Sequence, residues 1–118
     1  MANTFRRGKV GEQAAIDFLI AKGHQILEIN FRRMHKEIDI ISKEGVVLVF
    51  TEVKTRSNFD FGYPEEAVDL QKQEHIKTVA SIFLSENEQY QQVRFDIISI
   101  LLKGNMVKEI VHWEDAFY

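Results

Sequence analysis

Apolar residues recur at helical spacing in two parts of the chain. In the first, Val10, Ala14 and Phe18 lie about one turn apart, and the Lys22-Gly23 pair that follows suits a helix C-terminus. In the second, Pro64 fits a first helical turn and an apolar stripe follows it. The pattern therefore predicts amphipathic helices over 8–21 and 64–85. The stripe of the second helix consists of Val68, Ile76, Val79, Ala80, Phe83 and Leu84.

Five other segments are rich in the β-branched and aromatic residues that favour strands. The third of them is apolar at nearly every position, which predicts burial on both faces and a central place in the sheet. Residues 42–45 and 103–105 have turn composition, and residues 32–36 form a basic connection. The order αβββαββ predicts one α/β domain over 1–118, with a mixed sheet flanked by helices. The predicted strands cover 25–31, 37–41, 46–54, 93–102 and 106–113.

Composition excludes several classes of protein. With 45% hydrophobic and 28% charged residues, the 118-residue chain has the make-up of a folded globular protein. It has no cysteine, which excludes disulfides and thiolate zinc sites. No apolar run is long enough to span a membrane, no secretory signal opens the chain and no glycine-rich phosphate loop occurs. A cytoplasmic protein is therefore expected, and a nucleotide-dependent small-molecule enzyme is disfavoured.

The charges are distributed unevenly. Residues 1–56 hold ten Lys/Arg against seven Asp/Glu, a balance of +3, whereas residues 57–118 hold five against eleven, a balance of −6. The basic half is either an ordinary solvated surface or a positive rim for nucleic acid. Lys72 stands on the apolar stripe of the second helix, where it either reaches a site or extends along the edge of the core. The candidate nucleic-acid-binding residues are Arg7, Lys9, Arg32, Arg33, Arg56 and Lys72.

Acidic residues and a lysine occupy two predicted strands, where side chains at i and i+2 share a face. Glu37 and Asp39 are therefore expected on one face, with Ile38 and Ile40 on the other. Glu52 and Lys54 share a face of the most hydrophobic strand, where an unpaired charge is costly. Two carboxylates can bind Mg²⁺, and a nearby lysine can orient water and stabilise charge on a phosphate. Exposed ion pairs at strand ends are the alternative.

The spacing raises a geometric problem for a shared metal site. A hairpin that turns at 42–45 would place Asp39 opposite Leu48 or Val49. Glu52 would then lie three or four positions further along, roughly 10–13 Å away. One metal ion cannot bridge that gap, so the strands must separate or bulge at their open end.

Motifs along nearly the whole chain carry a family resemblance. Because these motifs follow one another in the family's order, the chain resembles the YraN family. These are bacterial proteins related to archaeal Holliday junction resolvases within the PD-(D/E)XK nuclease superfamily. Two positions depart from the pattern: Ile38 stands where the superfamily often has proline, and Lys36 where the family commonly has glycine. The matching segments are 8–12 (GKVGE), 30–32 (NFR), 37–41 (EIDII), 49–56 (VFTEVKTR), 61–64 (FGYP), 94–97 (RFDI) and 116–117 (AF).

The resemblance implies a restriction-endonuclease-like fold with separated strands at the site. It implies that Asp39, Glu52 and the Val53 carbonyl bind Mg²⁺ or Mn²⁺, that Lys54 is the catalytic lysine, and that Glu12 is an accessory acid. The expected activity is hydrolysis of DNA phosphodiester bonds, including branched or damaged structures, with homodimer formation by analogy. The alternative is a non-catalytic nucleic-acid-binding or protein-interaction module that retains the fold. The aromatic residues Phe59, Phe61 and Tyr63 are expected to cap the core rather than to stack on bases.

Overall fold

Within the described residues, two helices and five strands follow the order that the hydrophobic pattern predicts. The computed structural model describes residues 2–57 and 68–118, with side chains from Gly8 onward. The expected contacts of Phe59, Phe61 and Tyr63, and the helical turn expected at Pro64, lie outside the described residues. The elements are α1 (Ala2–Ala21), β1 (Gln25–Arg33), β2 (Lys36–Glu44), β3 (Val47–Arg56), α2 (Leu70–Glu86), β4 (Gln92–Lys103) and β5 (Met106–Phe117).

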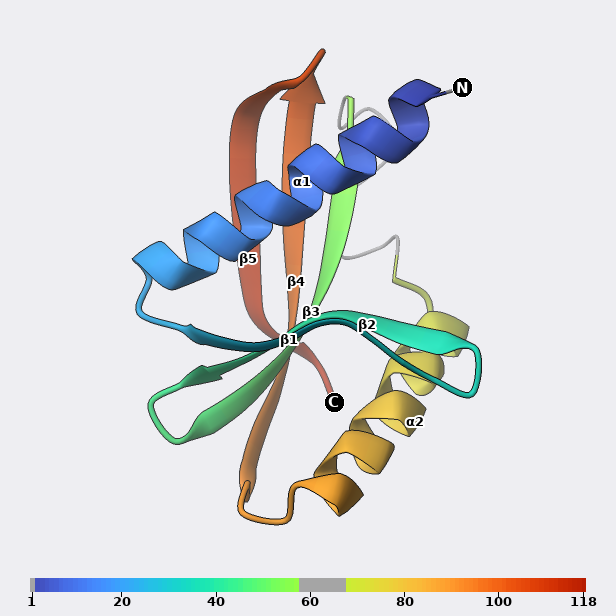
Figure 1. Ribbon diagram of the computed structural model, residues 1–118, viewed down its shortest axis with the longest axis vertical. Coiled ribbons are helices and arrows are strands. Elements are labelled where there is room, and N and C mark those ends of the chain that lie inside the picture. Colours follow the sequence, from blue (N-terminus) through green and yellow to red (C-terminus); the bar gives the residue numbers. More distant parts are fainter. Residues whose placement is uncertain (1, 58–67) are drawn as a thin grey trace.

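The strands form one mixed sheet in the order β1-β2-β3-β4-β5 (Figure 1). Neighbouring strands are antiparallel except β3 and β4, which are parallel and are separated in sequence by α2. The predicted central place of β3 is confirmed, and its residues 48–52 are buried. This mixed five-stranded sheet with two helices is the restriction-endonuclease-like arrangement that the sequence motifs imply.

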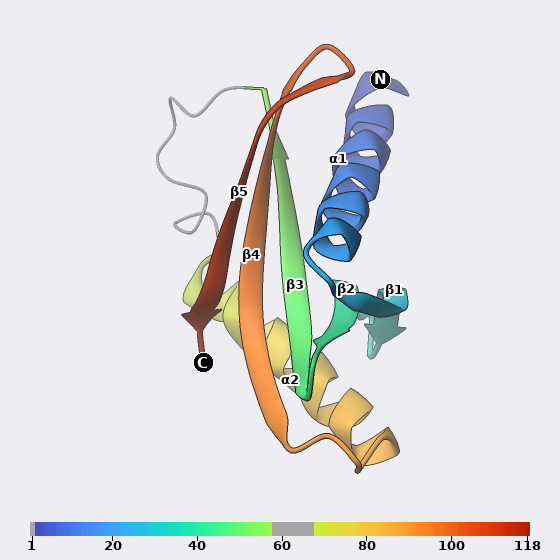
Figure 2. The same cartoon turned by 90° about the vertical axis from the view of Figure 1, so that its left-hand side faces the viewer.

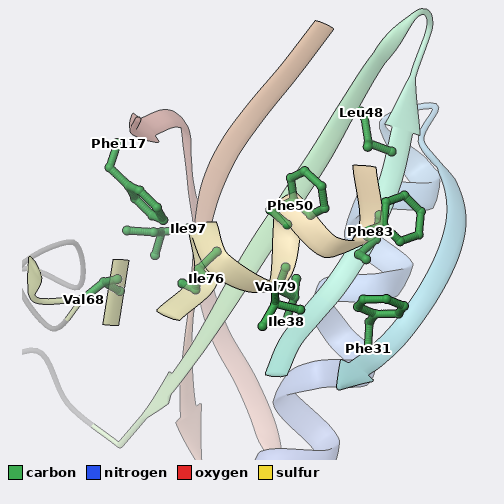
Figure 3. Packing of buried hydrophobic residues seen from close by; sticks show 12 residues of the cluster. Phe31, Ile38, Leu48, Phe50, Val68, Ile76, Val79, Phe83, Ile97 and Phe117 are labelled. Carbon is green, nitrogen blue, oxygen red and sulfur yellow. The ribbon is translucent and has the colours of Figure 1, made fainter. Parts of the chain in front are cut away.

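Each helix covers one face of the sheet, and each face has its own apolar cluster (Figure 2). On the α2 side, the Phe83 ring meets those of Phe31 and Phe50 edge-on, with centroids 5.2 and 6.0 Å apart (Figure 3). The α2-side cluster includes Ile38, Ile41, Leu48, Phe50, Ile76, Val79, Phe83 and Ile97. The α1-side cluster includes Ala15, Ile16, Leu19, Ile40, Ile98, Ile100 and Leu102.

The predicted turn between the second and third strands was wrong. β2 continues to Glu44, β3 begins at Val47, and the two-residue turn consists of Gly45 and Val46. Gly45 has a φ of +60°, whereas Val46 is not among the positive-φ residues. Glycine at the first central position suits a type II′ hairpin turn, whose twist matches that of the flanking strands. The exposed Val46 resembled a strand residue in sequence because it is β-branched.

The start of the second helix was also placed wrongly. α2 begins at Leu70 rather than in a helix continuous from Pro64, because Asp69 is an extended N-cap. The Asp69 side chain accepts a hydrogen bond from the Lys72 backbone N–H at 2.8 Å. Such a cap satisfies a backbone donor at the helix start. Val68, assigned in sequence to the helix stripe, is buried in the α2-side cluster although it precedes the helix.

A buried ion-pair network joins β4 to β5. Asp96 is fully buried and accepts two hydrogen bonds from the Arg94 guanidinium, at 2.9 and 3.0 Å. His112 contacts the same carboxylate at 2.7 Å, and the Asp115 N–H donates to it at 3.0 Å. Burial would raise the pKa of Asp96, but the hydrogen bonds from His112, Arg94 and Asp115 outweigh burial and lower it. This aspartate is therefore held as an anion by the fold.

The close packing of α1 on β3 predicts a stability change at Gly11. A Cβ at this position would overlap the Thr55 hydroxyl, whereas Gly8 in the same helix has no neighbour within 4 Å. We expect Gly11→Ala to lower the free energy of unfolding by about 1–3 kcal/mol, as overpacking does. The matched variant Gly8→Ala should raise it by up to about 1 kcal/mol, because alanine favours the helix. Urea denaturation measures both changes, and equal effects would contradict the packing.

Candidate metal centre

The register of β2 and β3 brings Asp39 and Glu52 to the same level of the sheet. Paired residues run from Glu44↔Val47 to Ile40↔Thr51, so the next position in register would set Asp39 against Glu52. The separation of roughly 10–13 Å expected from a turn at 42–45 does not arise, because the turn lies at residues 45–46. Beyond Ile40 and Thr51 the pairing ends, although both strands continue. The expected separation of the strands is therefore present as well.

The Asp39 carboxylate occupies the gap where pairing ends. Its Oδ2 accepts a hydrogen bond from the Val53 backbone N–H at 2.7 Å, in place of a ladder bond from β2. The pKa of Asp39 is raised from 3.8 to about 7, mainly by burial and secondly by the negative charge of Glu52. The hydrogen bond from the Val53 N–H acts in the opposite direction and lowers it. A side-chain hydrogen bond between the two carboxyl groups raises this pKa further. The two carboxyl groups therefore lie in contact inside the protein.

Glu52 is the more deeply buried member of the pair, with 6% of its surface exposed. Its Oε2 is buried without a hydrogen-bond partner, while its Oε1 lies 3.8 Å from the Lys72 Nζ. Lys72 therefore reaches towards the site from α2 instead of only extending along the edge of the core. A lone ammonium at this distance offsets part of the charge and leaves one carboxylate oxygen unsatisfied.

Two further acids lie close enough to Asp39 to affect its charge. The Glu12 carboxylate on α1 is half-buried and accepts a hydrogen bond from the Asn30 side chain at 2.9 Å. Its negative charge raises the pKa of Asp39. The pKa of Glu37 is raised as well, mainly by burial and secondly by the charge of Asp39. Four acids from α1, β2 and β3 thus converge, which creates a strongly negative region that favours a cation.

Asn30 was missed in sequence as a contributor to this region. It has a φ of +54° within β1, a conformation that asparagine adopts more readily than most residues. On the neighbouring strand β2, Ile38 packs in the α2-side cluster and Ile40 in the α1-side cluster, so these two isoleucines lie on opposite faces of the sheet. The expectation that these two isoleucines share a face was therefore wrong. The signal available in sequence was a polar asparagine between two apolar strand residues.

Lys54 and Val53 complete the predicted set on β3. Lys54 is half-buried, two residues after Glu52 on the same strand, and makes no ion pair or side-chain hydrogen bond within the described part of the chain. The N–H and C=O of one strand residue project towards the same edge. Because the Val53 N–H meets Asp39, its carbonyl faces the same gap. The Val53 carbonyl is thus available to a ligand between the strands.

These donors fit a hard divalent cation. Two carboxyl groups in contact, one orphaned carboxylate oxygen and a backbone carbonyl are the oxygen ligands that Mg²⁺ takes. Among the described residues, no group of three His, Cys, Asp or Glu side chains has the geometry of a metal site. A cation here would therefore complete its shell with water, as Mg²⁺ usually does.

The candidate nucleic-acid-binding residues do not form one cluster. Arg32 and Arg33 lie at the exposed end of β1, and Arg33 contacts Glu86 at 3.3 Å. Arg56 is half-buried at the end of β3 with its Nε unsatisfied, and Lys9 is exposed on α1. The Arg7 side chain lies outside the described residues. Among the described residues of this set, Lys72 forms an ion pair with Glu52, and the charge of Arg32 acts on Glu37.

Fold and site together define a restriction-endonuclease-like α/β protein with an acidic cluster at the opening of two central strands. The model of "Uncharacterised protein family UPF0102" matches residues 11–100. The UPF0102 protein of Caldicellulosiruptor bescii is 46% identical over 113 residues, which cover 93% of this chain and 95% of that protein. The protein of Dictyoglomus turgidum is 44% identical over 110 residues, covering 91% and 90%. The protein of Natranaerobius thermophilus is 42% identical over 118 residues, covering 98% and 99%. The chain belongs to the UPF0102 family, which confirms the YraN resemblance.

The raised pKa of Asp39 predicts an unusual pH dependence of stability. The Asp39 carboxyl group binds its proton more tightly in the folded state than in the unfolded chain. Protonation of Asp39 therefore stabilises the fold fully below about pH 4, and this stabilisation is lost as the pH rises through 7. Asp39→Asn keeps an acceptor for the Val53 N–H and removes the charge. In metal-free buffer we expect unchanged stability at about pH 4 and a gain of about 1–4 kcal/mol at about pH 8, measured by urea denaturation.

Asp96 offers a matched control for this prediction, because its pKa is lowered where that of Asp39 is raised. Asp96→Asn removes the partner of Arg94 and should cost about 3–5 kcal/mol at about pH 8. Loss of stability at pH 8 in the Asp39→Asn variant as well would contradict the electrostatic account of the site.

Proposed function

We propose that this protein is a divalent-metal-dependent nuclease that hydrolyses phosphodiester bonds in DNA. The observation that carries the proposal is the contact between the half-buried Asp39 carboxyl group and the buried Glu52 carboxyl group, where pairing between β2 and β3 ends. A fold has no structural need to bury two acids against one another, since this arrangement costs stability. Strain of this kind gathers at functional sites.

Each residue of the site has a chemical role in this proposal. Asp39, Glu52 and the Val53 carbonyl would hold the ion. A bound Mg²⁺ or Mn²⁺ would supply polarisation of the phosphate and a lowered pKa of a coordinated water. Lys54 would donate hydrogen bonds to the attacking water or to a phosphate oxygen and offset the charge that builds during the reaction.

The residues around this set would maintain the charge of the site. Glu12, held by Asn30, would accept protons or orient water at the α1 side. Lys72 would limit repulsion between the acids before an ion binds, because its ammonium lies 3.8 Å from Glu52. Assembly as a homodimer stays a prediction by analogy.

A non-catalytic module that retains this fold is the second candidate. It is favoured by the Lys72–Glu52 ion pair, which partly neutralises the acids without a metal. The intact combination of Asp39, Glu52 and Lys54 argues against it, because binding alone does not require all three.

A cleavage assay tests the activity directly. Linear, nicked, flapped and four-way DNA, together with RNA, would be incubated with Mg²⁺ or Mn²⁺. We expect metal-dependent cutting of DNA, with rates at least about 10²-fold lower in Asp39→Asn and Lys54→Ala, because each variant removes a group that stabilises the transition state. Lys103→Ala, at the exposed end of β4, should cut like the wild type. Cutting that survives in both site variants would assign the activity to another site or to a contaminant.

Metal binding can be measured without any reaction. Millimolar Mn²⁺ should raise the melting temperature of the wild type at about pH 8, because a ligand of the folded state stabilises it by mass action. Glu52→Gln should abolish this increase, whereas Glu109→Gln, on an exposed position of β5, should retain it. An equal increase in the Glu52→Gln protein would place the ion elsewhere.

A further inference from the structure

The hairpin between β1 and β2 has an exposed methionine at its tip. Pairing continues to Arg33↔Lys36, so Met34 and His35 form a two-residue turn. Their φ angles are +54° and +62°, and the Met34 side chain is 64% exposed. Such a type I′ turn normally takes asparagine and glycine, because both positions need the left-handed conformation. Turn chemistry therefore does not account for a methionine here.

Basic residues flank this apolar tip in the sequence. Residues 29–36 contain no acid, while Arg32, Arg33, His35 and Lys36 adjoin Met34. Arg33 is held in place by the Phe31 ring, 4.4 Å from its guanidinium carbon, and by Glu86. Arg32 and His35 are exposed, and Lys36 is half-buried. An exposed apolar side chain with basic residues on both sides in sequence matches the chemistry of a nucleic acid, in which phosphates flank the stacked bases.

The hairpin also belongs to the strand that carries the candidate metal centre. Lys36 and Asp39 are three residues apart on β2, roughly 10 Å at the usual rise of a strand. Met34 lies in the turn just beyond Lys36, a little further from Asp39 than Lys36 is. At a rise of about 3.4 Å per base pair, the tip would reach DNA about three or four base pairs from a phosphate at Asp39. Figure 1 shows this hairpin projecting from the sheet beside α2.

We propose that the β1–β2 hairpin is a DNA wedge, in which Met34 inserts at a base step while Arg32, His35 and Lys36 contact the flanking phosphates. Apolar side chains flanked by cations are known to unstack base steps in this way. The cost of unstacking is lowest where stacking is already interrupted, so the preferred substrate is nicked, mismatched or branched DNA rather than continuous duplex. This inference rests on the proposed function for its choice of nucleic acid, but it requires no cleavage.

Fluorescence of 2-aminopurine tests the wedge in metal-free buffer, so that no strand is cut. The analogue would be placed at successive positions of a nicked duplex and of a four-way junction. We expect binding of the wild type to raise the fluorescence at least about twofold at one step only, because an inserted side chain unstacks a single site. Met34→Ala should abolish the rise in fluorescence, although the basic residues of the hairpin still bind DNA. Met34→Leu should restore the rise.

Met106 provides a matched control. It is 66% exposed and follows the Gly104-Asn105 turn of the other hairpin, so Met106→Ala removes an equivalent side chain elsewhere. This variant should keep the wild-type signal, and circular dichroism would verify that every variant is folded. An unchanged rise in Met34→Ala, a rise spread over all positions, or no DNA binding by the wild type would each overturn the wedge. A single-step rise in a protein that cuts nothing would instead refute the nuclease while the wedge stands.

Discussion

The pairing of β2 with β3 determines where the acids of the site lie. A glycine turn sets the register, and a slip of one residue would send Asp39 to the other face of its strand. The ladder stops at Ile40 and Thr51, and the Asp39 carboxylate takes the Val53 N–H that β2 would otherwise have paired. Buried apolar clusters on both faces of the sheet hold the two strands in place. The gap between them is thus a built feature rather than a frayed end.

The buried Asp96 and the half-buried Asp39 show how differently the protein treats its charges. Asp96 is surrounded by donors that lower its pKa, so its charge strengthens the fold. Asp39 is placed against Glu52 and near Glu12, and its pKa rises to about 7. The charged form of Asp96 is therefore stabilised by its surroundings, whereas the charged form of Asp39 is destabilised. Local conflict of this sort, in an otherwise consistent fold, is expected at a functional site. It also explains why Lys72 and Asn30 matter, since each provides a partner for one of the acids.

Much of this arrangement could be predicted from the sequence, because hydrophobic periodicity specifies faces and elements. It predicted the element order and the central strand, whereas a shared site for Asp39 and Glu52 was implied only by the family resemblance, because the predicted turn held them too far apart. It could not supply the register, since β-branched Val46 looked like part of β3 and concealed a Gly-Val turn. The role of Asn30 was also hidden, because its left-handed backbone and its bond to Glu12 depend on how α1 crosses the sheet. Asp69, by contrast, carried a readable N-cap signal ahead of α2.

The central claim is that the gap beside Val53 is a divalent-metal site. Anomalous diffraction from crystals containing Mn²⁺ tests this claim most directly, since the ion is located independently of any activity. We expect a single strong peak between β2 and β3, within about 2–2.5 Å of oxygens from Asp39, Glu52 and the Val53 carbonyl. A peak at other residues, or an empty gap at saturating Mn²⁺ with both carboxylates ordered, would contradict it.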